Sequence, residues 1–186
     1  MSRQLRVETR PEETMARPDW YAIYTCANHE KRVAAELGAR SVEHFLPLYS
    51  SVRRWKQRRV RLELPLFPGY VFVRIALGER LRVLEIPSVV RLVGFRGLPA
   101  ALPEDEIAAL RCGLSSGRSR TEPCPRWATG RRVRITGGPF AGLCGVMKRC
   151  KAGLRVVVSL DLIERSVAVE VDAGEIQLRP EKGNGA

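Results

Sequence analysis

The feature of this sequence that most constrains the fold is a change of pattern near residue 115. Residues 20–112 alternate between runs of β-branched and aromatic residues and stretches with apolar residues at helical spacing, which predicts interleaved strands and helices. From residue 130 the chain turns to short runs of alternating apolar and polar residues separated by glycines, a pattern typical of a small β-barrel. The sequence therefore predicts an α+β domain followed by a barrel.

The length of 186 residues fits one medium and one small domain. Residues 115–123 are rich in serine, glycine and charged residues, which is the composition of a linker. We expect the chain to divide into a flexible tail at 1–18, the α+β domain at 19–113, a linker at 114–127, the barrel at 128–180 and a second tail at 181–186.

Particular residues set the expected elements. Asn28 is predicted to cap the first helix, and Leu81 and Leu84 are predicted to face inward from the second. The predicted strands of the first domain cover 20–25, 43–49, 70–75 and 88–95, and its helices cover 28–40, 78–86 and 104–112. The barrel strands are expected at 132–136, 143–150, 154–160 and 166–171, where valine alternation favours a stable barrel.

Residues 65–73 gather two prolines, one glycine and three aromatics. Pro68 and Gly69 predict a stiff bend, because proline fixes φ and glycine tolerates conformations that other residues avoid. In the strand that follows, Tyr70 and Phe72 share one face. Two interpretations stay open: a core strand that contains aromatics, or an apolar patch that is presented to a partner.

A basic segment covers residues 53–61, where six of nine side chains are positive. It predicts a β-hairpin that turns near Gln57. One hypothesis is a solvated charged hairpin, and the other is a phosphate-facing arm with Trp55 available to stack on a base or to pack beneath the arm. The basic residues are Arg53, Arg54, Lys56, Arg58, Arg59 and Arg61.

The net charge of +12 favours anionic partners such as nucleic acid. Five cysteines, an odd number without a CxxC pair, indicate neither a disulfide framework nor a zinc ribbon. Free thiols and the lack of a long apolar run predict a cytoplasmic protein without membrane contact. Cys26 and His29 lie three residues apart, the spacing of a thiol-imidazole pair or of half a metal site. Their side chains need not converge, because one follows a strand and the other opens a helix, and no third ligand is near in sequence, so we expect no enzyme, metal or cofactor.

The motifs in combination resemble the NusG family of transcription elongation factors. The segment 20–21, the helix after it, the segment 67–71 and the segment 89–97 are similar to the family's N-terminal NGN domain. Residues 130–146 are similar to its KOW motif, with glycines at 130, 137, 138, 142 and 145. The resemblance covers roughly residues 19–180 in the expected order.

The resemblance implies binding to RNA polymerase, with the tip of the β′ clamp helices in a hydrophobic pocket and a bridge toward the β subunit. The residues that would line this pocket are Tyr21 or Tyr24, Pro47, Phe67, Pro68, Tyr70 and Phe72. The basic segment would lie toward upstream or non-template DNA. The KOW domain would recruit the ribosomal protein NusE or the termination factor Rho, with Leu162 and Ile163 as exposed contacts. The protein would act as a monomer.

The loop at 159–171 lacks the phenylalanine-glycine pair that is usual in housekeeping members. In this respect it resembles the specialised paralogues of the RfaH, UpxY and LoaP kind, which act on selected operons. The alternatives are a housekeeping NusG and a KOW-type protein that binds RNA or the ribosome.

Overall fold

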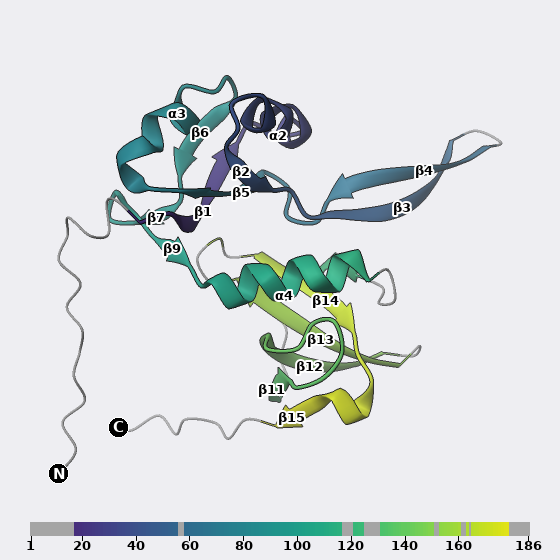
Figure 1. The fold of residues 1–186 in the computed structure, drawn as a ribbon. Helices are drawn as coiled ribbons and strands as arrows, with labels where there is room; N and C mark the ends of the chain where they lie inside the picture. The colour runs from purple at the N-terminus through teal and green to yellow at the C-terminus, as the bar shows by residue number, and fades with distance from the viewer. Residues whose placement is uncertain are drawn as a thin grey trace, which may run out of the picture.

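The computed structural model describes residues 17–55, 58–116, 121–124, 131–150, 153–160, 163 and 165–178. These residues form an N-terminal mixed α/β half and a C-terminal antiparallel sheet, and a long helix lies between the two (Figure 1). The prediction of an α+β first half followed by short strands is confirmed in outline.

The N-terminal half is built on a five-stranded sheet in the order β2-β5-β1-β6, with β9 also paired to β1. Every pairing in it is antiparallel, and the central β1 and β5 align Tyr24 with Tyr70 and Ala22 with Phe72. The strands are β1 (Asp19–Thr25), β2 (Glu43–Phe45), β5 (Tyr70–Ile75), β6 (Val89–Leu92) and β9 (Ala101–Leu102).

Strand alternation divides this sheet into two faces with separate cores. Ile23, Val71 and Val73 belong to the core beneath helices α2 (Glu30–Ala39) and α3 (Arg80–Leu84). On the other face, Trp20, Ala22 and Phe72 belong to a core that extends into the C-terminal sheet. The prediction that Tyr70 and Phe72 share a face is confirmed, since both belong to this second core.

Two hairpins leave the N-terminal sheet. β3 (Leu48–Trp55) and β4 (Arg58–Pro65) pair along their whole length, and Figure 1 shows this hairpin reaching away from the body of the molecule. The predicted hairpin is confirmed by this pairing, which runs as far as Trp55 and Arg58, and its expected turn near Gln57 lies outside the described residues. A shorter hairpin joins β7 (Gly94–Phe95) to β8 (Leu98–Pro99).

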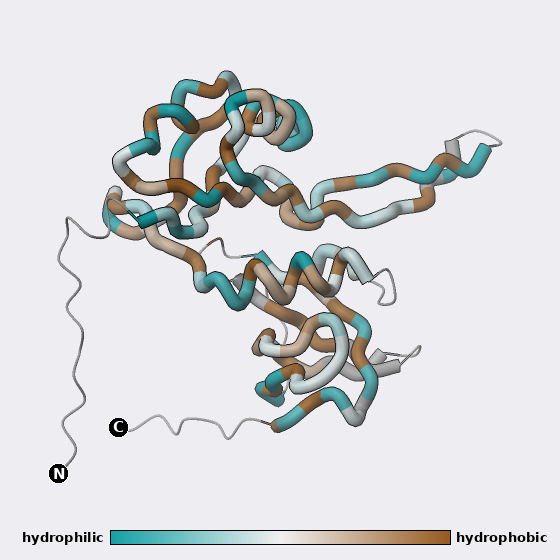
Figure 2. Tube along the Cα trace, viewed as in Figure 1, coloured by the Kyte–Doolittle hydropathy of each residue, from teal (hydrophilic) through white to brown (hydrophobic). Residues whose placement is uncertain are grey.

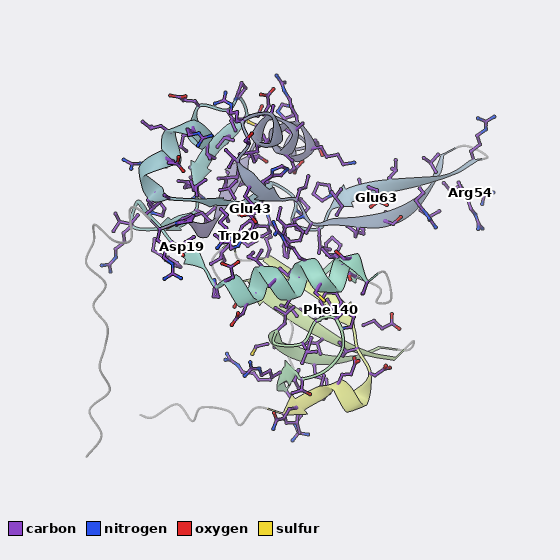
Figure 3. The ribbon with its side chains drawn as sticks, in the orientation of Figure 1. Asp19, Trp20, Glu43, Arg54, Glu63 and Phe140 are labelled. Atoms are coloured by element: carbon purple, nitrogen blue, oxygen red, sulfur yellow. The ribbon has the colours of Figure 1, made fainter. Side chains whose placement is uncertain are left out.

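Helix α4 (Glu104–Ser115) is fixed to the N-terminal sheet by Arg111 and by its first turn. The guanidinium of Arg111 lies 4.6 Å from the ring centroid of Trp20, and its Nη1 donates to Oε1 of Glu43 at 3.3 Å. Arg74 of β5 pairs with Glu104 at 3.2 Å. Figure 3 shows Trp20 and Glu43 on the side of α4 that faces the N-terminal sheet. Glu104, Asp105 and Glu106 also suit the positive end of the helix dipole.

The C-terminal strands form one antiparallel sheet in the order β10-β14-β13-β12-β11-β15. Four of them match predicted strands within two residues at each end; β10 and β15 were not predicted. The strands are β10 (Thr121–Cys124), β11 (Arg132–Ile135), β12 (Cys144–Cys150), β13 (Gly153–Leu160), β14 (Arg165–Glu170) and β15 (Ile176–Leu178). A short 3-10 turn at Ala173–Glu175 precedes β15, and another at Leu77–Glu79 precedes α3 in the N-terminal half.

Two predictions about local structure in the first half are wrong. Asn28 does not cap α2: its φ is 62°, and the N-cap residue is His29, without a side-chain hydrogen bond. The strand expected at 43–49 is split into β2 and β3, because Pro47 has no N–H for a sheet ladder.

Two further predictions need correction. Leu81 is 61% exposed, whereas Val83 is buried, because α3 begins at Arg80 and turns Val83 inward. The expected linker at 114–127 is not all irregular: Thr121–Cys124 is strand β10, which pairs with β14.

Candidate functional site

The bend at 67–70 is held by two backbone hydrogen bonds, one made by Gly69 and one that closes the turn around it. Its carbonyl accepts from the N–H of Thr25 at 2.9 Å, and the N–H of Tyr70 donates to the carbonyl of Phe67 at 3.1 Å. Gly69 has a φ of +86°, and a Cβ there would lie 3.2 Å from the ring of Tyr24. Its conformation therefore favours glycine, and a side chain there would also push the ring of Tyr24 aside by a few tenths of an ångström.

Beside this bend, Tyr24 and Tyr70 form the aromatic pair of the site. Their ring centroids are 5.4 Å apart with an interplanar angle of 54°, and Tyr24 is 37% exposed. Pro68 is also exposed, and the guanidinium of Arg91 lies 5.6 Å from the ring centroid of Tyr24. We call Tyr24, Pro68 and Tyr70 the aromatic surface; it is apolar in the middle and bordered by positive charge.

Phe67 and Phe72 lie below this surface and not on it. They are 1% and 0% exposed, and their rings meet edge to face at 5.7 Å. Phe45 stacks on Phe72 at 6.2 Å, and Pro47 is buried as well. In this docked arrangement Phe67, Phe72 and Pro47 are buried and support the aromatic surface from below, and their expected place in the lining of the pocket stays a prediction.

Tyr21 does not belong to the aromatic surface. It is 1% exposed and packs in the core beneath α2, on the face of the sheet opposite to Tyr70. Burial, with a smaller contribution from the charge of Asp19, raises the pKa of its hydroxyl above the usual value. Tyr21 and Tyr24 are three residues apart in β1, and an odd separation in a strand places side chains on opposite faces, so of the two only Tyr24 lies beside Tyr70.

Glu30 was not predicted as a site residue. It is only 4% exposed, and its Oε1 accepts a hydrogen bond from the N–H of Gly69 at 2.7 Å. In the sequence it is one acidic residue in the first turn of a helix, which the helix dipole alone explains. Its contact with a residue 39 positions away has no signal in the local pattern.

The β3–β4 hairpin places its arginines on two faces. Arg54 is directly opposite Arg59, and Arg61 is two residues beyond Arg59, so these three exposed side chains share one face. Arg58 lies on the other face together with Val60. Figure 2 shows hydrophilic and hydrophobic positions alternating along this hairpin.

The three arginines of that face have no carboxylate partner among the ion pairs of the described residues. Like charges directly opposite each other on a sheet repel, so the Arg54–Arg59 pair does not stabilise the hairpin itself. Arg53 lies in β3, but its side chain is outside the described part, and so is Lys56. Figure 3 labels Arg54 near the far end of the hairpin.

The C-terminal sheet packs toward the aromatic surface. The guanidinium of Arg165, at the start of β14, lies 5.8 Å from the ring centroid of Tyr70. One continuous hydrophobic cluster contains Phe67 and Phe72 together with Val156 and Val167 of the C-terminal sheet. In this structure the C-terminal sheet is therefore docked and not separated from the N-terminal half.

Helix α4 forms the middle of this docked arrangement. Phe140 is 1% exposed, and Figure 3 shows it against α4, on the side away from Trp20. A Cβ on Gly113 would lie 1.9 Å from a ring carbon of Phe140. The two halves thus meet where a phenylalanine ring fits against a glycine of the helix.

The predicted KOW contact at Leu162 lies outside the described residues. The prediction that Ile163 is exposed is wrong, because its side chain is 2% exposed and belongs to the core. An apolar residue in a loop can fold inward onto a sheet, and the sequence alone does not distinguish this case from an exposed one.

The side-chain contact of His29 is with Ser88, which is distant in sequence from Cys26. Nδ1 of His29 is 2.8 Å from Oγ of Ser88, and both His29 and Cys26 are surface residues at the start of α2. In the described part of the chain, no three His, Cys, Asp or Glu side chains gather as a metal site. Within the same residues, no helix is long and apolar enough to cross a membrane.

The family profile described as "Transcription termination factor nusG" matches residues 18–111, which is the part that carries the aromatic surface. The chain belongs to the NusG family. NusG proteins are non-catalytic transcription factors, so the prediction that the chain is not an enzyme is confirmed by its membership. Proteins of this family bind RNA polymerase in transcription.

Curated relatives align with most of the chain. The transcription termination/antitermination protein NusG of Escherichia coli K12 is 29% identical over 173 residues, covering 85% of this chain and 94% of the relative. The NusG protein of Rickettsia felis is 24% identical over 172 residues, covering 85% and 88%.

Among solved structures, one described as domain interaction in Thermotoga maritima NusG matches with a TM-score of 0.55. It is 23% identical, and the match covers 86% of this chain and 96% of the other. At this identity the match supports the fold, including the mixed α/β N-terminal half.

Proposed function

We propose that this protein is a transcription elongation and antitermination factor that binds RNA polymerase through the aromatic surface. The observation that carries the proposal is the Tyr24–Tyr70 pair, two rings 5.4 Å apart beside a bend fixed by Gly69. Aromatic side chains held rigidly at a surface are typical of binding hot spots, because little conformational entropy is lost when they are buried. The proposed contact is the tip of the β′ clamp helices, with a bridge toward the β subunit.

Charge complements this apolar contact. Arg91 and Arg165 lie over the rings of Tyr24 and Tyr70, on the two flanks of the pair. A partner that inserts an apolar tip with acidic neighbours would cover the rings and pair with Arg91. Arg165 belongs to the C-terminal sheet, so it would stay over the ring of Tyr70 only if that sheet stayed docked.

Tyr70→Ala is expected to weaken binding to core RNA polymerase about 30-fold, the equivalent of a hot-spot loss of about 2 kcal/mol. The substitution also removes the contact with Arg165, a cation–π contact worth about 0.5–1 kcal/mol that favours the docked state. The hot-spot loss is the larger effect, so the net result is weaker binding. Titration of labelled protein with core polymerase measures it.

Phe95→Ala provides the matched control, because Phe95 is 66% exposed on β7 but lies outside the aromatic surface. This variant should bind polymerase like the parent. Arg165→Ala should bind equally well or more tightly, since it weakens docking and leaves both tyrosines in place. Equal affinities for the parent and Tyr70→Ala would show that the polymerase contact lies elsewhere.

The arginine face of the β3–β4 hairpin is proposed to lie against upstream or non-template DNA. Arg54, Arg59 and Arg61 share a face, are exposed, and form none of the ion pairs among the described residues. Their mutual repulsion would fall when phosphate groups lie between them, so an anionic partner gains binding energy at no cost to folding. Like other phosphate contacts, these would position the nucleic acid without specifying its sequence.

Arg59→Gln is expected to weaken binding of the full chain to duplex DNA more than Arg58→Gln, its neighbour on the opposite face. Each lost phosphate contact should reduce the slope of log K against log salt by about 0.9. The thermal stability of Arg59→Gln should not fall, because the substitution removes the repulsion from Arg54. Equal losses for the two variants would contradict the assignment of a single DNA-facing side.

The C-terminal half is proposed to be a KOW domain that recruits a second partner, NusE or Rho. The supporting observations are the antiparallel strands β11 to β15 and the glycine pattern at 130–146. Since Ile163 is buried, we propose that the partner contact does not involve it in the docked arrangement. The domain boundaries proposed from the sequence are retained, except that the linker contributes β10.

We further propose a specialised role on selected operons, supported by the absence of a phenylalanine-glycine pair at 159–171. Transcription through a Rho-dependent terminator, with and without this protein, is the direct test. A specialised antiterminator should increase read-through, whereas a protein that acts like housekeeping NusG should increase termination by Rho. No change in either direction would reject both roles.

Docking of the C-terminal sheet should affect polymerase binding, because Arg165 lies over Tyr70 and one hydrophobic core joins the sheet to the N-terminal half beneath the aromatic surface. Polymerase and the C-terminal sheet would then compete for Tyr70. The undocked state is proposed to be the one that binds polymerase fully.

A further inference from the structure

The bend that carries Tyr70 is fixed by one buried carboxylate from a distant part of the chain. Glu30, the first residue of α2, is 4% exposed, and its Oε1 lies 2.7 Å from the backbone N of Gly69. A hydrogen bond from a backbone N–H to a carboxylate is stronger than one between neutral groups. The carboxylate is also stabilised by its place at the positive end of the α2 dipole.

Gly69 is therefore held on both sides of its backbone. Its N–H donates to Glu30, and its carbonyl accepts from the N–H of Thr25 at 2.9 Å. Thr25 directly follows Tyr24, and Gly69 directly precedes Tyr70. The two bonds thus fix the chain beside both rings of the aromatic pair.

Backbone conformations at this end of the sheet indicate that the surroundings impose the geometry. Asn28 has a φ of 62°, Ser88 a φ of 77° and Gly69 a φ of +86°. The first two are uncommon for residues with a Cβ and persist only when nearby contacts hold them. For Ser88 these contacts are two hydrogen bonds: the N–H of Cys26 donates to its carbonyl at 2.9 Å, and Nδ1 of His29 lies 2.8 Å from its Oγ.

We infer that Glu30 is a positioning residue for polymerase binding, which sets the distance and angle between Tyr24 and Tyr70 through its bond to Gly69. This inference rests on the proposed function of the aromatic surface. Glu30 itself has little exposed surface with which to touch a partner, so it acts through the bend. Without its bond, the N–H of Gly69 loses its acceptor, and the bend gains freedom that must be given up again on binding.

Three variants of the full chain test this role. Glu30→Ala removes the acceptor, whereas Glu30→Gln keeps a carbonyl oxygen at the same position. Val33→Ala is the control for structural damage: Val33 is 0% exposed on the same helix but belongs to the core beneath α2, whereas Phe67 and Tyr70 of the bend belong to the core on the other face of the sheet. The readouts are affinity for core RNA polymerase, melting temperature and hydrogen exchange at the Gly69 amide.

Glu30→Ala is expected to weaken polymerase binding about tenfold and to speed Gly69 exchange by a similar factor. Glu30→Gln should keep both values within about threefold of the parent, because its amide oxygen still accepts. Val33→Ala should lower the melting temperature as much as Glu30→Ala or more, yet leave the affinity of the folded protein unchanged.

Unchanged affinity in Glu30→Ala, together with weakened binding in Tyr70→Ala, would overturn the positioning role and leave the proposed function intact. If Tyr70→Ala also binds like the parent, the proposed function fails, and the role of Glu30 in polymerase binding fails with it. Gly69 exchange would then still decide whether Glu30 fixes the bend: unchanged exchange would overturn that step too. A loss of affinity in Val33→Ala equal to that in Glu30→Ala would assign the effect to general destabilisation.

Discussion

Gly113→Ala is expected to separate the C-terminal sheet from α4 and to raise the affinity for RNA polymerase. The added Cβ would lie 1.9 Å from a ring carbon of Phe140, and three atoms of that ring lie within 2.4 Å of it. Phe140 is 1% exposed, so its ring has little room to move aside. The helix itself should gain stability from this change, by about 1 kcal/mol, because alanine is the better helix former.

The clash with Phe140 destabilises the docked arrangement, whereas the alanine stabilises helix α4 itself. A stable α4 with an unfavourable contact at Phe140 favours the state in which the sheet leaves the helix. If the parent is docked 99% of the time, full release would raise the apparent affinity for polymerase by up to about 100-fold. The radius of gyration in solution scattering reports the separation, and polymerase titration reports its consequence.

Gly38→Ala is the matched control for the helix effect. Gly38 lies in α2, and a Cβ there would have an ordinary contact of 3.5 Å with His44. This variant should gain helix stability without any change in radius of gyration or affinity. Phe140→Leu combined with Gly113→Ala should restore part of the docking, because a smaller side chain leaves room for the methyl group. An unchanged radius of gyration in Gly113→Ala would contradict a tight glycine contact at this position.

The fold could be predicted from the sequence wherever the local pattern and the tertiary contacts agree. The strands β1 and β5 combine β-branched or aromatic residues with clear bends, and both appear where they were expected. The four central C-terminal strands were found from alternation around valines such as Val156 and Val169. Errors occurred where one residue broke a pattern, as Pro47 does between β2 and β3.

The candidate site was predictable only in part, since its composition is local but its arrangement is not. The bend at 67–70 is visible in the sequence, and strand alternation places Tyr70 and Phe72 on one face. Alternation does not say which of these side chains is covered, because that depends on α4 and the C-terminal sheet. The contact of Glu30 with Gly69 joins residues 39 positions apart, and one sequence contains no signal for it.

The docked arrangement also lay beyond local pattern. The linker was predicted from its composition, yet its residues 121–124 form β10 on the edge of β14. An edge strand offers free N–H and C=O groups, and a nearby polar segment can pair with them whatever its composition. Residues 121–124 therefore form a strand mainly because β14 has an open edge, and less because of their own composition.

Phe72→Ala is expected to destabilise the protein far more than Tyr70→Ala, although both residues lie on the same face of β5. Phe72 is 0% exposed and meets Phe67 edge to face at 5.7 Å, so truncation leaves a cavity in the core. A buried phenylalanine replaced by alanine typically costs about 3–5 kcal/mol, a large fraction of the roughly 5–15 kcal/mol that keeps a domain folded. Urea denaturation followed by circular dichroism measures the loss.

Comparing Phe72→Ala with Tyr70→Ala distinguishes a residue that supports the aromatic surface from one that contacts polymerase directly. Phe72→Ala should lose polymerase binding in proportion to the fraction of the protein that unfolds. Phe72→Leu should recover most of the stability and most of the binding, because leucine keeps much of the apolar volume. Tyr70→Ala should lose binding while remaining folded. If Phe72→Ala instead melts like the parent and still fails to bind, Phe72 contacts polymerase directly, in a state where the C-terminal sheet has left the core that it shares with Phe72. The midpoint of denaturation, measured beside the affinity, therefore assigns each residue to the core or to the interface.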